Sequence, residues 1–484
     1  MTQPSDYRLP LGQRLAYAVG HVQNDLFAAM WFSYLLLYLQ HVVLLPETTA
    51  GMIFLIGQFC DGIITPWIAY ESDRLNWRCY GKRKTTHLIG TVVISLTFPF
   101  VFTRCYGCEN ASYWSLVIYF VPLVCLFQSG WAAVQVSHLS LIPELTNVPK
   151  ERDELNIIRY AFDILTDAAV YVITYFVLIY HTADVLPEEA ISPNNADVFR
   201  NISFILLFVG VIFTGIFHVF TPEKTGTGNG SSSDDSSLGS YMIWKDWFKV
   251  ASFYKIAIVF SVSRVITNIL QAFIPLYLQE GTQAPQQLIA TIPLIINLSG
   301  FVSSLLVKPI LRCLSKKSLF MISAGCTFIS CIWFAWDDPN NIRDQNIYII
   351  AVLSGVGGSM MLVLALSLAA DLIGENTESG GFVYGCMAFA EKIINGVTIL
   401  AFQAGKGSCV GCTTYYRNVL CYGVCFFVMV NLLAVLCLNS SNLYVSKPIL
   451  LDDESELSFS TLLDNKKKKY GAVRSGFQLF SKST

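Results

Sequence analysis

Long apolar runs follow one another along almost the whole chain and are separated by short polar segments. Twelve of these runs are long enough for a membrane-spanning helix, which needs about 20 largely apolar residues. They are continuous, without the alternating pattern of roughly ten residues that marks a barrel strand. The pattern predicts an all-α polytopic membrane protein, with spans centred near residues 28, 59, 95, 124, 171, 210, 264, 296, 327, 356, 391 and 428.

The composition agrees with a chain that lies mainly in lipid. Of its 484 residues, 54% are hydrophobic and 14% are charged, whereas a soluble globular chain has about 25% charged residues. The sequence also lacks a Gly-x-Ser-x-Gly or His-x-x-x-His pattern. We therefore expect neither a soluble protein nor an enzyme, and no catalytic residue, bound metal or nucleic-acid partner.

Lysine and arginine are concentrated in alternate loops. Such loops normally face the cytosol, so the distribution places both termini on the cytosolic side. The residues on that side are Arg74, Arg78, Lys82, Arg83, Lys84, Lys150, Arg152, Lys308, Arg312, Lys316, Lys317 and the run 466–469. The opposite loops hold only Arg104, Arg200, Arg343, Lys406 and Arg417.

A Gly/Ser/Asp-rich stretch at residues 225–235 separates the sixth and seventh predicted spans. Such a composition buries little apolar area and is typical of a flexible linker. A weak repeat between the halves favours a transporter with its site near mid-membrane at their interface. The expected parts are a cytosolic N-terminus (1–11), an N-terminal six-helix half (12–221), a flexible cytosolic linker (222–248), a C-terminal six-helix half (249–441) and a cytosolic tail (442–484).

Three ionisable residues, His21, Asp25 and Asp61, fall near the centre of predicted spans in the first half. An ionisable group in hydrocarbon costs roughly 2.5–3.5 kcal/mol on insertion scales, so such groups usually face the protein interior and serve a function. A buried acid can bind and release a proton, which a proton-coupled carrier requires, or can hold two helices together by pairing with a base. We favour the functional interpretation, with Asp61 as first candidate and Asp25 as second.

Several motifs resemble the glycoside–pentoside–hexuronide:cation symporter branch of the major facilitator superfamily. That resemblance implies the major facilitator fold, with twelve transmembrane helices in two six-helix halves. The motifs are Asp61-Gly62 with Pro66, Asp73-Arg74 with 81–84, the segment 140–145 with Glu151, Arg152 and Arg159, the segment 370–373, and Phe389, Glu391, Lys392 and Gly396.

More narrowly, residues 12–440 resemble a group of vertebrate and invertebrate members of the superfamily. The resemblance implies an alternating-access transporter that imports cysteine into the lumen of lysosomes and pigment granules. A cation-coupled symporter of sugar or another small solute, and a solute sensor that does not transport, remain alternatives. The partners are then a small solute and the lipid bilayer, with no cofactor beyond possible proton coupling. The segments that carry this narrower resemblance are 17–21, 24–26, 30–32, 137–140 and 290–294.

The family resemblance also assigns roles to single positions. Melibiose-type symporters carry two carboxylates one turn apart on the second span, and here Asp61 holds the first position but Thr65 the second. The family's sugar-binding acid on the fourth span falls on Gln135, while its acid on the first span is retained as Asp25. Because a hard cation needs several oxygen ligands, proton coupling or uncoupled exchange is favoured over sodium coupling.

An amino-acid substrate needs a buried base for its carboxylate and a buried acid for its ammonium group. Asp25 and Lys392 are expected to supply them from opposite halves, with Arg264 nearby, because arginine suits carboxylates. The other candidates for substrate or coupling-ion contact are Asp61, Gln135, His21, Asn24 and Asn268. Candidates for a gate are Asp73, Arg74 and Arg159.

Two Cys-x-x-Cys pairs, Cys105/Cys108 and Cys409/Cys412, fall in loops on the non-cytosolic side. Disulfides are favoured over free thiols or a metal, and three pairings are possible, including cross-links between the halves. Asn110 and Asn201 begin Asn-x-Ser sequons on the same side and are candidate glycosylation sites.

Overall fold

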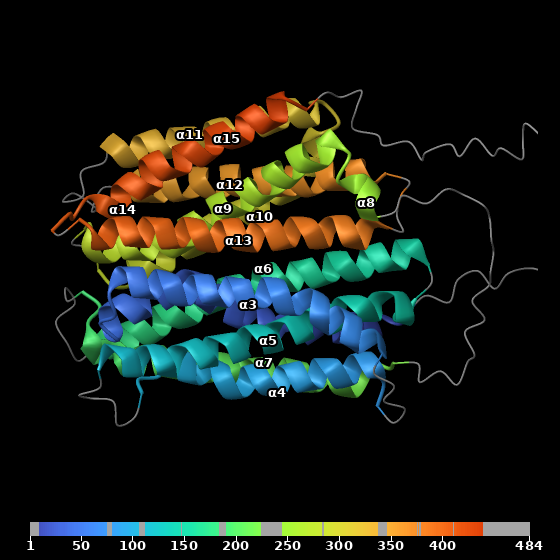
Figure 1. Cartoon of the computed structure of the whole chain (residues 1–484), viewed down its shortest axis with the longest axis horizontal. Coiled ribbons are helices and arrows are strands. Elements are labelled where there is room, and N and C mark those ends of the chain that lie inside the picture. Colours follow the sequence, from blue (N-terminus) through green and yellow to red (C-terminus); the bar gives the residue numbers. More distant parts are fainter. Residues whose placement is uncertain are drawn as a thin grey trace, which may run out of the picture.

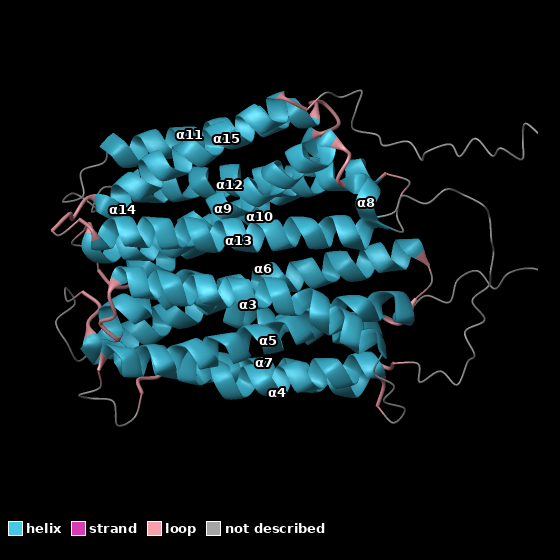
Figure 2. Cartoon of the chain, viewed as in Figure 1, coloured by secondary structure: helices cyan, strands magenta, loops and turns pink. Residues whose placement is uncertain are grey.

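The computed structural model describes residues 9–74, 80–105, 112–146, 148–182, 190–223, 244–282, 285–336, 346–374, 376, 379–409 and 411–438. Within these ranges the ordered elements are helices, and no strand occurs (Figure 2). Among the described residues, eleven helical segments are long and apolar enough to cross a membrane. The prediction of an all-α polytopic membrane protein is confirmed.

The first predicted span is built from four consecutive helical segments. A 3₁₀ turn interrupts it at Val19–His21, and a π-helical turn ends it at Tyr38–Val42. Such irregular turns inside helices often mark functional positions. The helices are α1 (Leu11–Ala18), α2 (Val22–Leu37), α3 (Glu47–Arg74), α4 (Lys82–Val101), α5 (Tyr113–Leu145), α6 (Pro149–Thr182), α7 (Ala196–Phe220), α8 (Trp244–Trp247), α9 (Ala251–Glu280), α10 (Leu288–Ile310), α11 (Lys316–Trp336), α12 (Asn346–Ile373), α13 (Gly380–Gly407), α14 (Tyr415–Asn418) and α15 (Val424–Leu436).

The long helices lie roughly along one direction in two groups (Figure 1). Helices up to α7 form the lower group in that view and helices from α8 onward the upper group; we call them the first and second halves. The helices α3 and α6 of the first half pack against α13 and α10 of the second. We name the two ends of the bundle after the short helices that lie there, the α8 end and the α14 end (Figure 1).

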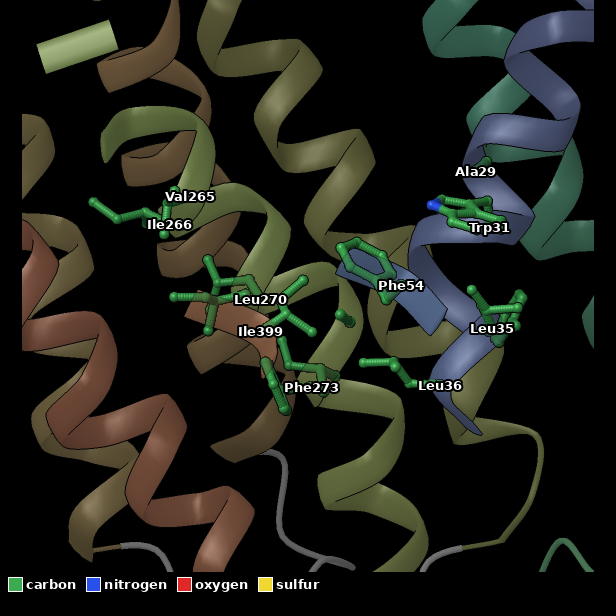
Figure 3. Packing of buried hydrophobic residues seen from close by; sticks show 14 of the residues in the cluster. Ala29, Trp31, Leu35, Leu36, Phe54, Val265, Ile266, Leu270, Phe273 and Ile399 are labelled. Atoms are coloured by element: carbon green, nitrogen blue, oxygen red, sulfur yellow. The ribbon is translucent and has the colours of Figure 1, made fainter. Parts of the chain in front are cut away.

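A continuous apolar core joins the two halves. Figure 3 shows Leu36 of α2 and Phe54 of α3 on one side, with Leu270 and Phe273 of α9 on the other. Ile399 of α13 belongs to the same buried cluster. Because lipid tails are as apolar as these side chains, the tight packing itself, rather than removal from water, holds the helices together.

Small residues allow α4 and α5 to approach closely. A Cβ atom placed on Gly90 would lie 2.8 Å from the Cβ of Ala133, and one on Gly130 would lie 2.8 Å from Cγ2 of Ile94. Real Cβ atoms essentially never come within 3.0 Å of such neighbours. Glycine at both positions is therefore required by the contact between these helices.

The predicted flexible linker, residues 222–248, is ordered at both of its edges. The carboxylate of Glu223 accepts hydrogen bonds from the backbone N–H groups of Arg83 at 3.1 Å and Lys84 at 2.8 Å. An acid at a helix N-terminus satisfies donors that the helix leaves free. At the other edge α8 forms, and its Trp247 is fully buried. Residues 224–243 lie outside the described ranges, as do the tail residues from 439 onward.

Candidate transport site between the halves

A cavity of about 190 Å³ lies near the middle of the bundle, between α6 of the first half and α9, α10 and α12 of the second. Its walls carry more polar groups than a lipid-facing surface would. These polar residues are Tyr160, Asp163, Asp167 and Tyr171 of α6, Arg264, Thr267, Asn268 and Gln271 of α9, Asn297 of α10, and Ser354 and Ser359 of α12.

The first half contributes two acids to this cavity. Asp163 and Asp167 are four residues apart on α6 and therefore lie on the same helix face. The side-chain amide of Asn297 donates a hydrogen bond to Asp167 Oδ2 at 3.2 Å. Asp163 forms a side-chain hydrogen bond with Asp25. Two carboxyl groups that lie this close repel each other when both are ionised, so the pair can share a proton.

The second half contributes a base. Arg264 of α9 lies on the cavity wall, and 45% of its side chain is exposed. Its Nε atom is 3.8 Å from Oε1 of Glu391, too far for a strong hydrogen bond, so the guanidinium group remains available to a ligand. Asn268 instead binds Glu391 through its side chain. The cavity thus presents a cation on one wall and carboxyl groups on the opposite wall.

Asp61 and Lys392 form an ion pair that joins α3 to α13. The hydroxyl group of Thr65 donates a second hydrogen bond to the Asp61 carboxylate, at 2.8 Å. Both side chains are largely buried, with 6% of Asp61 and 14% of Lys392 exposed. Thr65, at the position where the symporter branch has a second acid, thus serves here as a hydrogen-bond donor to the first acid.

The other predicted contacts gather around Asp25. Its Oδ1 atom is 2.6 Å from Nδ1 of His21, and the Asn24 side-chain amide is 3.2 Å from Nε2 of the same histidine. Arg159 lies close enough for its charge to act on Asp25. Gln135 is half-buried on α5. The side chains of the two other gate candidates, Asp73 and Arg74, lie outside the described residues.

The structure therefore divides the predicted site into three parts. Arg264 and Asn268 lie on the cavity wall. Asp25 is connected to that wall through Asp163. Lys392, expected to face Asp25 across the cavity, instead pairs with Asp61.

Sequence reasoning missed the acids on α6 and their partner Asn297. The signal was present, since Asp163 and Asp167 are acids one turn apart in an apolar run. The argument applied to Asp61 applies equally to them. Their placement beside Arg264 comes from the packing of α6 against α10 and from its hydrogen bond to α9 through Tyr171 and Gln271, which no local pattern predicts.

Cys105, Cys409, Cys412 and Asn201 are the members of the cysteine pairs and sequons that the structure describes. Cys409 and Cys412 form a disulfide with each other, so in this structure neither joins the two halves. Cys105 is also disulfide-bonded. Asn201 is exposed within the first two turns of α7. Cys108 and Asn110 lie outside the described residues.

Polar contacts between the halves close the α14 end. Glu280 of α9 is 3.3 Å from His41 of the first half and 2.6 Å from Lys406 of the second. The hydroxyl group of Tyr416 donates to Gln40 at 3.0 Å across the same interface.

At the α8 end, by contrast, the ion pairs Arg14–Glu151, Arg83–Glu144 and Lys316–Asp371 each lie within one half. The structure thus represents the state of the bundle in which the α14 end is closed.

Comparison with known proteins agrees with this architecture. Residues 16–405 match the family model described as MFS/sugar transport protein. The human major facilitator superfamily domain-containing protein 12 is 37% identical over 465 residues, which cover 92% of this chain and 96% of that protein.

Among solved structures, the inward-open xylose transporter XylE of E. coli has a TM-score of 0.63 at 15% identity and covers 87% of this chain and 94% of its own. A D-xylose–proton symporter has a TM-score of 0.64 at 14% identity, with 88% and 96% covered. These two likenesses establish the fold. The chain therefore belongs to the MFS/sugar transport protein family of the major facilitator superfamily, and within it to the group of major facilitator superfamily domain-containing protein 12.

Proposed function

We propose that this protein is an alternating-access carrier that imports cysteine, coupled to protons, into the lumen of lysosomes and pigment granules. The observation that carries the proposal is the arrangement of opposite charges in the cavity. Arg264 suits a substrate carboxylate, and Asp167 with Asp163 suits a substrate ammonium group. A zwitterionic amino acid satisfies both walls at once.

The size of the cavity supports a small solute. At about 190 Å³ it is smaller than the roughly 300–1,000 Å³ of pockets for drug-sized ligands. The choice of cysteine among small amino acids, and the placement in lysosomes and pigment granules, rest on the family resemblance. On this proposal the α8 end faces the cytosol and the α14 end faces the lumen, in agreement with the basic loops.

Proton coupling is supported by the carboxyl pair Asp25–Asp163. Two adjacent carboxyl groups can share one proton, and a substrate ammonium group that binds Asp163 would compete with that proton. Sodium is disfavoured because Asp61 is neutralised by Lys392 and receives its second contact from a hydroxyl group. A hard cation needs several oxygen ligands with negative charge.

The test is uptake of labelled cysteine by vesicles that contain the purified protein, with and without a pH gradient. Cystine and melibiose serve as competing solutes. We expect saturable cysteine uptake that Arg264→Ala and Asp167→Asn abolish. Lys249→Ala, which removes a lysine with 77% of its side chain exposed, should have no effect. Uptake of melibiose but not cysteine would refute the proposed substrate. Cysteine binding without uptake would indicate a sensor.

A further inference from the structure

Four of the six histidines of the chain lie together inside the first half, near the α8 end. They come from four different spans, so their meeting is a property of the fold and not of a local motif. His87 and His138 are fully buried, and His21 is 4% exposed. The four residues, which we call the histidine column, are His21 before α2, His87 on α4, His138 on α5 and His218 on α7.

The outer part of the column begins at the surface. Tyr80 is 39% exposed, and its hydroxyl group is 2.8 Å from Nδ1 of His218. Nε2 of His218 is 3.1 Å from Nδ1 of His87, and Nε2 of His87 is 3.0 Å from the carbonyl oxygen of Gly20. An unbroken series of hydrogen bonds therefore runs from the protein surface to a buried carbonyl group.

The carbonyl group at its inner end fixes the direction of this series. A carbonyl oxygen only accepts, so Nε2 of His87 donates and its Nδ1 accepts from His218 when both rings are neutral. Nδ1 of His218 then accepts from the Tyr80 hydroxyl group. Every N–H and O–H bond in the series points inward.

The inner part of the column continues toward Asp25. The ring centroid of His138 lies 6.0 Å from that of His87 and 5.4 Å from that of His21. Nε2 of His138 donates to the carbonyl oxygen of Tyr17 at 2.8 Å. Its Nδ1 is buried without a hydrogen-bond partner, so it can accept a proton. No hydrogen bond joins these rings directly, so transfer from His87 to His138 and from His138 to His21 requires a ring rotation or a bridging water molecule.

The hydrogen bond between His21 and Asp25 also points inward, from the column toward the cavity. The Asn24 amide donates to Nε2 of His21, so the neutral His21 ring donates from Nδ1 to Asp25. Asp25 in turn binds Asp163 on the cavity wall. The column therefore connects the surface at the α8 end to the carboxyl pair at the cavity.

A purely structural role explains only part of this arrangement. The bonds from His87 to Gly20 and from His138 to Tyr17 tie helices together, but each uses one ring nitrogen. The second nitrogen of His87 faces another histidine, and that of His138 has no partner. Two buried histidines that only join helices would not need a third imidazole and a tyrosine leading outward to solvent.

Charged groups flank the column at both ends. Arg159 acts on His21 and His138 at the inner end, where Asp25 and Asp163 carry the acidic groups. At the outer end Lys84 donates from Nζ to the backbone oxygen of His218 at 2.9 Å and lies 4.6 Å from the Tyr80 ring, with Glu223 beside it. Each end of the column therefore carries both a cation and an acid.

We propose that the histidine column conducts protons between the surface at the α8 end and the Asp25–Asp163 pair. From Tyr80 to His87 each imidazole ring gains a proton at one nitrogen while the other nitrogen releases its own to the next ring. His87 and His138 must first turn their Nε2–H groups away from the carbonyl groups of Gly20 and Tyr17, and then pass the proton to His138 and His21. A second ring rotation restores the starting tautomers. The proton ends on the Asp25 carboxylate. The proposal rests on the proposed proton-coupled transport, and it assigns the path by which the coupling proton moves between the carboxyl pair and the α8 end.

The test compares two activities in the same vesicles. Uptake driven by a pH gradient needs net proton movement, whereas exchange of labelled for unlabelled cysteine at equal pH does not. His87→Gln and His218→Gln retain hydrogen-bonding groups but do not relay protons. We expect at least about a tenfold loss of gradient-driven uptake, on the scale of lost proton transfer, and unchanged exchange. His181→Gln, in the last turn of α6 and outside the column, is the matched control.

Each outcome decides a different point. Gradient-driven uptake that is unchanged in both variants would overturn the column while leaving the proposed function intact. Wild-type protein that exchanges cysteine but ignores a pH gradient would remove proton coupling and the column with it. If His87→Gln also loses exchange, the test uses Tyr80→Phe and His218→Gln, which alter the partly exposed outer end of the column. Loss of gradient-driven uptake with normal exchange in these two variants supports the column, and full activity of both in the two assays refutes it.

Discussion

Lys392 of α13 forms an ion pair with Asp61 of α3 across the interface of the two halves. Both side chains are largely buried, so each charge depends on the other. The pair lies on the helices that pack most directly between the halves, outside the wall of the cavity. Its position favours a role in holding one arrangement of the halves over direct contact with substrate.

The first prediction follows from this pair. Asp61→Asn or Lys392→Met alone leaves a buried charge without a partner, which costs about 3–5 kcal/mol. The double variant removes both charges and should recover most of that loss. Thermal unfolding of the purified protein in detergent measures the effect. Additive losses in the double variant would show that the two residues do not act as a pair.

A second prediction concerns the packing of α4 against α5. Gly90→Ala should lower stability by about 1–3 kcal/mol, because the added methyl group meets the backbone of α5. Gly215→Ala on α7 is the matched control, since no atom lies within 4 Å of its new Cβ. Thermal unfolding of the two variants measures the difference. Equal stability would mean that α4 and α5 are further apart than described.

A third prediction concerns closure of the α14 end. Glu280→Gln weakens the ion pair with Lys406, worth about 1.5–3 kcal/mol, and the contact with His41 at 3.3 Å. We expect a larger population open at that end. Spin labels on the two halves at the α14 end should show longer distances in double electron–electron resonance measurements. Lys249→Ala supplies the control, and unchanged distances would exclude these contacts as a gate.

The sequence predicted the fold better than the site, for a physical reason. Span length and apolar composition are local properties, so the helices could be placed from the pattern alone. Asp61 and Asp25 stood out in the same way, as acids in apolar runs. Their partners could not be predicted, because the pairing of Asp61 with Lys392 depends on the packing of α3 against α13.

The histidine column also could not be predicted from the sequence. His87, His138 and His218 lie 51 and 80 residues apart along the chain, and each is unremarkable within its own span. Only the packing of four helices brings them into one series of contacts. Sequence reasoning identified His21 alone, through its neighbour Asp25.

The last prediction separates the two charges of the substrate. If Arg264 binds the carboxylate, Arg264→Ala should weaken cysteine binding by about 1.5–3 kcal/mol, or about 10- to 150-fold. Cysteamine, which lacks the carboxylate, should bind the wild type and this variant equally. Asp167→Asn should show the mirror image, weakening cysteine binding but leaving 3-mercaptopropionate, which lacks the amine, unaffected. Competition against labelled cysteine gives the affinities of the wild type and of each variant for cysteine and for the matching analogue. Changing Arg264 in the protein and removing the carboxylate from the ligand form a double-mutant cycle, in which a direct contact appears as non-additive losses. Additive losses would show that Arg264 does not bind the substrate carboxylate.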